Sequence, residues 1–272
     1  MSETIDKLLT LKVSSNLVVR QSASGKYEID IDAITSLGQQ VNKLSENTGV
    51  IIVTSYARKL LEDAGSGGGR KIVDTWGAAI ERETQSYQVS EMCDEIKDTR
   101  RIFNYVKAGG VAIVNANHYH LDAFSRFHNN DYVAADLVRQ ASSSALFDEG
   151  IELGLLTNVS GVLRDVEDKT SVISTLHAVN IRSLECQDLE WYEWVMGRSG
   201  EPMTVAGTGS TGGMATKLHA ALAVVSQAAD TRVWIADART DDVIERAMSS
   251  EVGTSIVGHG KESLDSSEVV WI

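Results

Sequence analysis

Short runs of apolar residues alternate along the chain with longer segments in which apolar residues recur every three or four positions. The apolar runs are rich in β-branched residues and predict strands, at residues 8–13, 50–54, 111–115, 153–157 and 233–236. Because these runs are apolar at nearly every position, we expect strands that are buried on both faces of a sheet. The periodic segments predict amphipathic helices, at residues 32–46, 132–141, 215–227 and 241–249.

Repetition of strand and helix is typical of an α/β protein with a mainly parallel central sheet. Three segments interrupt the pattern. Residues 64–70 predict a flexible loop, residues 205–213 a glycine-rich loop that leads into a helix, and residues 253–261 a series of closing turns. No linker divides the sequence, so we expect a single domain over residues 1–272, with a loose division near residues 147–150.

The composition narrows the class of protein. A chain of 272 residues, 43% of them hydrophobic, can bury a large core. A formal net charge of −13 repels nucleic acid and anionic membranes, so we expect neither as a partner. The two cysteines, Cys93 and Cys186, lie outside any metal-binding spacing and predict reduced thiols. Since we also expect no signal peptide and no membrane span, these features together predict a cytoplasmic protein.

The strongest chemical signal is the segment GSTGGMATKL, from Gly209 to Leu218. Its glycines allow the backbone to turn and to approach an anion closely. The helix that follows presents free N–H groups and the positive end of its dipole, and Lys217 lies in its first turn. The spacing differs from that of a Walker A loop, so two interpretations stay open. The segment forms either a phosphate site or a surface loop with an ordinary helix cap at Thr211 or Thr216.

A second signal is Lys12, at the end of the predicted strand 8–13. In open α/β sheets, ligands bind at the carboxyl ends of the strands. Lys12 could hold a phosphoryl group at that edge, or lie in solvent at a strand end. Three more strand ends carry small polar residues, in the segments VTSYA (53–57), NANH (115–118) and LLTNVSGV (155–162). Those residues could bind a small polar substrate or serve in turns.

Several other chemistries receive little support. His118, His120 and His128 have few carboxylate partners and no tight ligand spacing, so we predict no metal site formed by protein side chains. The sequence also lacks a nucleophile elbow, an HExxH motif and a GxGxxG fingerprint. These absences count against a hydrolase and against a dehydrogenase.

Taken in order, these segments resemble the motifs of the amino acid kinase family, and those of its glutamate 5-kinases most closely. The similarity extends over nearly the whole chain, through KVSS (12–15), VTSYA (53–57), NANH (115–118), HNND (128–131), LLTNVSGVL (155–163) and STGGMATKL (210–218). The last of these segments is the most specific. The resemblance implies a three-layer α/β/α sandwich in which roughly residues 1–150 bind the acceptor and residues 151–272 bind ATP.

The resemblance also implies roles for individual residues. Lys12 and Lys217 would neutralise the transferring phosphoryl group, and Asp131 would orient the two lysines. The acceptor, a small carboxylate, would contact Ser55, His118 and Asn130. Mg²⁺ would be carried by the ATP phosphates, and the chain would form a homo-oligomer, either a dimer or a tetramer. The expected nucleotide-binding residues are Lys12, Thr157, Asn158, Thr211, Gly212, Gly213, Met214, Ala215, Thr216 and Lys217.

Five positions depart from the family's motifs. Ser14 and Tyr56 replace glycines, and His118, Asn129 and Asn158 replace aspartates. Three hypotheses therefore stay open. The protein phosphorylates L-glutamate to glutamyl 5-phosphate for proline synthesis, or it phosphorylates a different small acceptor. Alternatively, it binds nucleotide without catalysis and serves as a sensor or storage protein.

Overall fold

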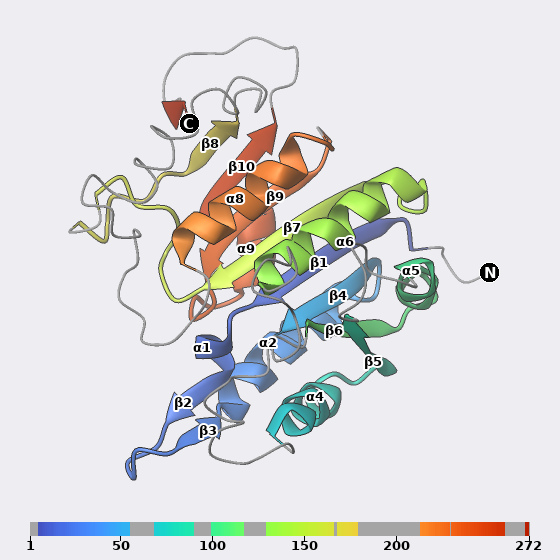
Figure 1. The fold of residues 1–272 in the computed structure, drawn as a ribbon, viewed down its shortest axis with the longest axis vertical. Coiled ribbons are helices and arrows are strands. Elements are labelled where there is room, and N and C mark those ends of the chain that lie inside the picture. The colour runs from blue at the N-terminus through green and yellow to red at the C-terminus, as the bar shows by residue number, and fades with distance from the viewer. Residues whose placement is uncertain are drawn as a thin grey trace.

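The computed structural model describes residues 5–54, 68–89, 99–116, 129–165, 168–178, 213–228, 230–258 and 270–271. Nine strands within these ranges form one sheet, in the order β11-β8-β10-β9-β7-β1-β4-β6-β5 (Figure 1). Their bounds in chain order are β1 (Lys7–Val13), β4 (Thr48–Thr54), β5 (Thr84–Val89), β6 (Val111–Ala116), β7 (Gly150–Thr157), β8 (Thr175–Ala178), β9 (Arg232–Asp237), β10 (Thr254–Gly258) and β11 (Val270–Trp271).

The sheet is mainly parallel. The six neighbouring strands from β9 to β5 all run in the same direction. β10 pairs antiparallel with β9, and β8 and β11 run parallel to β10. A separate antiparallel hairpin consists of β2 (Val19–Gln21) and β3 (Tyr27–Ile29). The predicted α/β class with a mainly parallel sheet is therefore confirmed.

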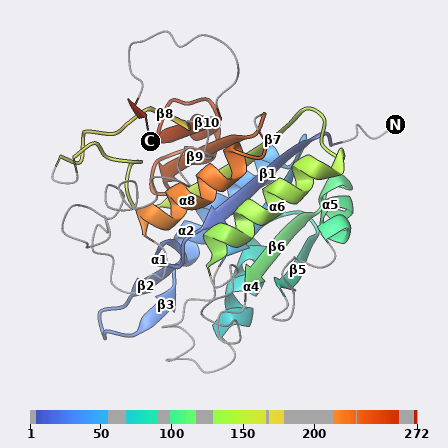
Figure 2. The ribbon, with the colours of Figure 1, turned by 45° about the horizontal axis from the view of Figure 1, so that its top comes forward.

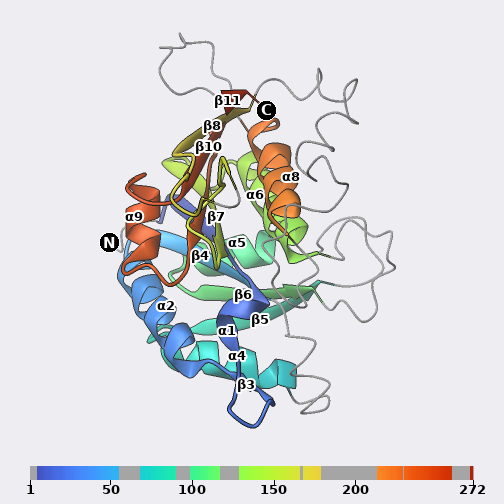
Figure 3. The ribbon, with the colours of Figure 1, turned by 90° about the vertical axis from the view of Figure 1, so that its left-hand side faces the viewer.

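Helices cover both faces of the sheet, as Figure 3 shows from the side. One face packs against α5 (Thr99–Lys107), α6 (Asn130–Ser144) and α8 (Met214–Val225). The opposite face packs against α1 (Ser15–Val18), α2 (Ile31–Leu44), α4 (Gly68–Ala79) and α9 (Val243–Met248). The two apolar clusters on either side of the sheet make up the core, and the arrangement is the expected three-layer sandwich.

Side chains along β1 point alternately to the two faces of the sheet, and this alternation determines which helix layer each side chain contacts. Leu8 belongs to the cluster under α6, whereas Leu9 and Leu11 belong to the cluster under α2. Successive side chains of a strand point to opposite faces, so Thr10 and Lys12 share the α6 face with Leu8. A hydrophobic strand thus delivers one lysine, at its carboxyl end, to the layer that contains α6 and α8.

The predicted strands and helices are all present, with ends that differ by a few residues. Two predictions were wrong. Residues 254–258, expected as turns, form β10 because the short segment pairs with β9 and β8 on its two sides. Residues 68–70, expected in a loop, begin α4, whose Ile72 and Trp76 are completely buried against the sheet. Among the described helices, none is long and apolar enough to cross a membrane.

Candidate active site

Lys12, Asp131 and Lys217 meet in one buried cluster. Lys12 Nζ lies 2.7 Å from Asp131 Oδ1, and Lys217 Nζ lies 3.4 Å from Asp131 Oδ2. The exposed fractions of the three residues are 6%, 0% and 3% in chain order. Two ammonium groups that are far apart in the sequence therefore share one carboxylate inside the protein.

Three different elements bring these side chains together at the carboxyl edge of the parallel strands. Lys12 comes from the end of β1, Asp131 from the first turn of α6, and Lys217 from the first turn of α8. α6 and α8 pack side by side, as Figure 2 shows, with α6 over β1 and β7 and α8 over β9 and β10. β1 and β7 are neighbours, and the chain continues from β1 to β4 on one side of this pair and from β7 to β8 and β9 on the other. The point where the strand order reverses in this way is where ligands bind in open α/β sheets.

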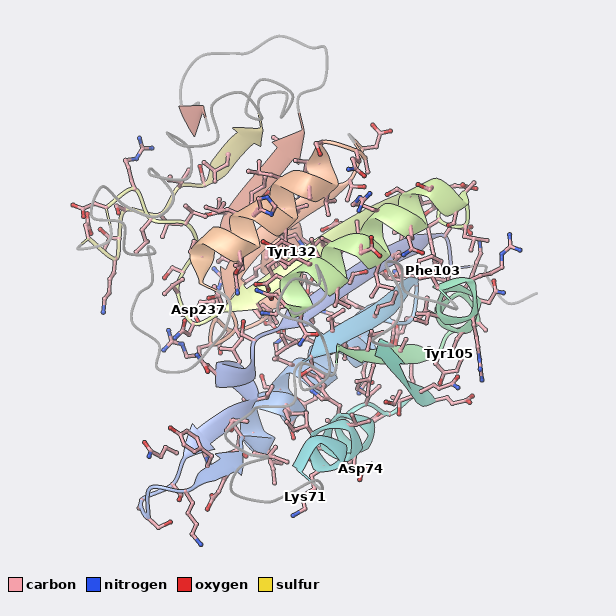
Figure 4. The ribbon with its side chains drawn as sticks, viewed as in Figure 1. Lys71, Asp74, Phe103, Tyr105, Tyr132 and Asp237 are labelled. Carbon is pink, nitrogen blue, oxygen red and sulfur yellow. The ribbon has the colours of Figure 1, made fainter. Side chains whose placement is uncertain are left out.

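The first turn of α6 is held by its cap. The Asn129 side chain accepts a hydrogen bond of 2.9 Å from the backbone N–H of Asp131, as expected of an Asn at this position. Tyr132, labelled in Figure 4, packs its ring perpendicular to that of His219 on α8, with 5.5 Å between ring centroids. These contacts fix where the Asp131 carboxylate lies relative to α8.

Two hydroxyl groups complete the cluster. Lys12 Nζ donates to Ser14 Oγ at 3.1 Å, and Ser14 Oγ donates to the Leu156 carbonyl oxygen of β7 at 3.0 Å. Thr216 Oγ1 lies 3.1 Å from Asp131 Oδ2 and 2.8 Å from the Gly213 carbonyl oxygen, and can donate to either. The N-cap of α8 is Gly213, so Thr216, inside the first turn, is not the cap; Thr211 lies outside the described residues.

Burial and charge act in opposite directions on these groups. Burial lowers the pKa of Lys12 and Lys217 lowers it further, while Asp131 raises it, and the resulting pKa is about 8. Burial would raise the pKa of Asp131, but the two ammonium groups and the hydrogen bonds from Lys12 and Thr216 bring that pKa below its ordinary value. Asp131 therefore stays ionised at neutral pH, and it is too weak a base to accept a proton.

The cluster carries one excess positive charge at neutral pH, since two ammonium groups face one carboxylate. An ammonium has three N–H donors, so each lysine can bind Asp131 and an incoming anion at once. The N-termini of α6 and α8 lie beside this cluster, and the positive ends of their helix dipoles add to its positive charge. In a low-dielectric environment, this arrangement can stabilise the negative charge of a transferring phosphoryl group.

The structure describes only some of the other predicted site residues. Thr157 is buried at the carboxyl end of β7, and Asn130 is buried in the first turn of α6. Asn158 is exposed, and its carbonyl oxygen accepts a hydrogen bond of 2.5 Å from Arg239 Nη2. Gly213, Met214, Ala215 and Thr216 lie at the start of α8. Four predicted site residues lie outside the described residues: Ser55, His118, Thr211 and Gly212. The two cysteines, Cys93 and Cys186, lie outside them as well.

Sequence reasoning missed three contributors. It treated Ser14 as a lost glycine, but the backbone there has φ −69° and ψ 143°, a conformation open to any residue, and the hydroxyl binds Lys12. It treated Asn129 as a lost aspartate, although an Asn just before a helix is a recognisable cap. The third is Arg239, which belongs to no motif recognised in the sequence. It bridges the turns after β7 and β9 through Asn158 and Asp237.

The architecture and the cluster together define an α/β sandwich protein with a buried Lys12–Asp131–Lys217 cluster at the carboxyl edge of its sheet. The chain belongs to the amino acid kinase family, whose model matches residues 7–237. Membership supports kinase activity on a small substrate and does not single out glutamate.

Solved structures share the fold. An isopentenyl phosphate kinase aligns with a TM-score of 0.55 and 18% identity over 92% of this chain and 100% of its own. A UMP kinase from Ureaplasma parvum aligns with a TM-score of 0.57 and 14% identity, over 92% of this chain and 98% of its own. N-acetylglutamate synthase from Neisseria gonorrhoeae, solved with coenzyme A and L-arginine, gives a TM-score of 0.59 and 13% identity; this chain spans 61% of its length. The comparison with curated proteins found no match.

Proposed function

We propose that the protein transfers the γ-phosphoryl group of ATP to a small acidic acceptor, with L-glutamate as the leading candidate and glutamyl 5-phosphate as the product. The observation that carries the proposal is the buried Lys12–Asp131–Lys217 cluster. Phosphoryl transfer needs little covalent chemistry from the protein, because positioning and charge stabilisation supply most of the rate enhancement. Two lysines held in place by one carboxylate supply both the positioning and the charge stabilisation.

Each residue has a distinct part in the proposed reaction. Lys217, at the start of α8, contacts the phosphates together with the backbone N–H groups of that helix terminus. Lys12 approaches the same phosphoryl group from the end of β1, where Ser14 limits the motion of its ammonium group. Asp131 orients both lysines and keeps its own negative charge, so the acceptor carboxylate attacks without a protein base.

Nucleotide binding is proposed for the turns after β7 and before α8. Thr157 and Asn158 follow β7, and Gly213 to Lys217 begin α8. Arg239 donates to the Asn158 carbonyl oxygen and forms an ion pair with Asp237 at 2.7 Å, which stabilises the turn after β7. Residues 151–272 would thus bind ATP, while residues 1–150 would bind the acceptor through Ser55, His118 and Asn130.

Protein ligands for Mg²⁺ do not fit the described part of the site. No group of three or more His, Cys, Asp or Glu side chains that could hold a metal occurs among the described residues. Both oxygens of Asp131 already face ammonium groups. We therefore assign no side chain to the metal; Mg²⁺ would arrive on the phosphates of ATP.

A phosphorylated acceptor is the second candidate. Two of the proteins that share the fold are kinases of isopentenyl phosphate and of UMP, by their names. The replacement of aspartates by His118 and Asn129 removes negative charge, which would favour an acceptor more acidic than glutamate. A cytoplasmic homo-oligomer remains part of the proposal in either case.

The deciding experiment measures ADP release from ATP and Mg²⁺ with glutamate, UMP, isopentenyl phosphate or no acceptor. We expect turnover with one acceptor. Lys217→Ala should lower kcat about 100-fold or more, because it removes a donor to the transferring group. Lys71→Ala is the matched control, since Lys71 is exposed on α4 (Figure 4) and should have no effect. Full activity in Lys217→Ala would refute the assignment.

Binding without turnover would identify the inactive alternative. ATP at 100 times its Kd should stabilise the protein by about 2.7 kcal/mol, which a thermal shift detects. A shift without ADP release on any acceptor would favour a sensor or storage role. The absence of both a shift and turnover would exclude nucleotide binding and the kinase proposal together.

A further inference from the structure

A cavity of about 560 Å³ lies outside the Lys12–Asp131–Lys217 cluster. It opens between α5, the second half of α6 and the residues that follow α8. Gln140, in its wall, is about 14 Å along the α6 axis from Asp131, from the helical rise per residue. The residues that line it are Thr99, Arg100, Phe103, Asp136, Arg139, Gln140, Ser143, Ser144, Leu146, Gln227 and Ala228.

The wall of this cavity is held by a hydrogen-bond network. Asp136, 6% exposed, accepts from Arg139 Nη1 at 3.2 Å and from Gln140 Nε2 at 2.8 Å. Gln140 Oε1 in turn accepts from Thr99 Oγ1 of α5 at 2.8 Å. Arg139 Nε donates to Gln227 Oε1, just after α8. The network connects three separate segments of the chain, so the cavity has a defined shape.

Arg100 gives the cavity an unused positive charge. Its side chain is exposed at the rim, and within the described residues it makes no hydrogen bond or ion pair. The charged lining consists of Arg100, Arg139 and Asp136, and the last two pair with each other. In a chain with a formal net charge of −13, a cavity with one excess positive charge will concentrate anions locally.

We propose that this cavity is a second ligand site, which takes a small organic anion whose carboxylate or phosphate oxygens bind the Arg100 guanidinium. The planar fork of an arginine suits both groups, and the serine, threonine and glutamine side chains add hydrogen-bonding groups for a polar ligand. The volume lies within the range of small-molecule sites. A ligand there contacts the last turns of α6 and the residues after α8, two helices whose first turns carry Asp131 and Lys217.

Isothermal titration of the full chain tests the site, with citrate as the carboxylate probe and inorganic pyrophosphate as the phosphate probe. Arg100→Gln removes the free guanidinium. Its matched control is Arg101→Gln, because Arg101 is exposed on the next position of α5 and does not line the cavity. We expect Arg100→Gln to weaken binding of at least one probe about tenfold. Arg101→Gln should leave it unchanged within about twofold.

Two further variants separate this cavity from the catalytic cluster. Ser143→Phe, at an exposed lining position, should obstruct part of the cavity and weaken binding of the same probe. Lys217→Ala should leave that binding unchanged. Failure of both probes to bind, equal affinities for the Arg100 and Arg101 variants, or unaltered affinity in Ser143→Phe would overturn the proposal. Loss of binding in Lys217→Ala would also overturn it, since the anion would then occupy the cluster. None of these outcomes depends on kinase activity.

Discussion

Replacing the shared carboxylate should affect stability far more than removing one of the lysines. In Asp131→Asn, the side chain keeps its shape but leaves Lys12 and Lys217 buried beside each other without a counter-charge. In Lys12→Met, the same cluster becomes neutral, because Asp131 still pairs with Lys217 at 3.4 Å. Both variants should lose catalysis, but for opposite electrostatic reasons.

The magnitudes follow from burial. Breaking a buried pair by removing one partner typically costs about 3–5 kcal/mol, which we expect for Asp131→Asn at pH 7. The pKa of Lys12 falls from 10.5 to about 8 even with Asp131 beside it, so keeping Lys12 charged in the native protein has a net cost of about 3 kcal/mol. Lys12→Met removes that net cost and leaves the Asp131–Lys217 pair in place, so we expect it to destabilise the protein far less than Asp131→Asn.

The dependence on pH gives a second test. A lysine with a lowered pKa in the folded state binds fewer protons there than in the unfolded state, so stability rises as pH increases between the two pKa values. For the native protein this window extends from about 8 to 10.5. Without Asp131 the folded pKa of Lys12 drops further and the window begins at lower pH. The deficit of Asp131→Asn relative to the native protein should therefore shrink between pH 7 and pH 9.

Urea unfolding followed by tryptophan fluorescence measures both effects, since the chain has five Trp residues. The free energy of unfolding is compared for the native protein and the two variants at pH 7 and pH 9. Equal destabilisation by Asp131→Asn and Lys12→Met would refute the reasoning, because it would mean that the carboxylate does not offset the two ammonium charges. A deficit that stays constant with pH would refute the electrostatic explanation.

The other predictions concern the carboxyl edge of the sheet and the packing between its central strands. Catalysis needs Lys12 charged, so kcat/KM should fall as pH rises through about 8; a profile flat to pH 10 would contradict this. Ser14→Ala should lower kcat without unfolding the protein, because Lys12 loses its contact with β7, whereas unchanged kinetics would show that the hydroxyl is dispensable. Gly154→Ala should destabilise by about 1–3 kcal/mol, since its Cβ would lie 2.4 Å from the Trp234 ring. Gly77→Ala on α4 is its control, where a Cβ meets only Thr84 Oγ1 at 3.3 Å; equal melting temperatures for the two variants would contradict the packing argument.

The sequence by itself determined the fold class and identified the charged residues expected at the carboxyl edge of the sheet. Apolar runs predicted the central strands, because strands buried on both faces need apolar residues at every position. The periodic segments predicted α2, α6, α8 and α9. Lys12 and Lys217 were recognisable from local patterns, since a lysine at a strand end or in the first turn of a helix is visible in the sequence alone, whereas Asp131 was assigned through the resemblance to the family's motifs.

Only the tertiary structure decided how these parts interact. The strand at Thr254–Gly258 forms because β9 and β8 flank it, and a five-residue segment carries too little local signal to show that. The Ser14 hydroxyl links Lys12 to β7 because β7 lies beside β1, with its Leu156 carbonyl within reach. The pKa of Lys12 depends on burial and on two charges from distant parts of the chain. Electrostatic effects act through space, so the sequence named the charged groups while the fold determined the distances between them.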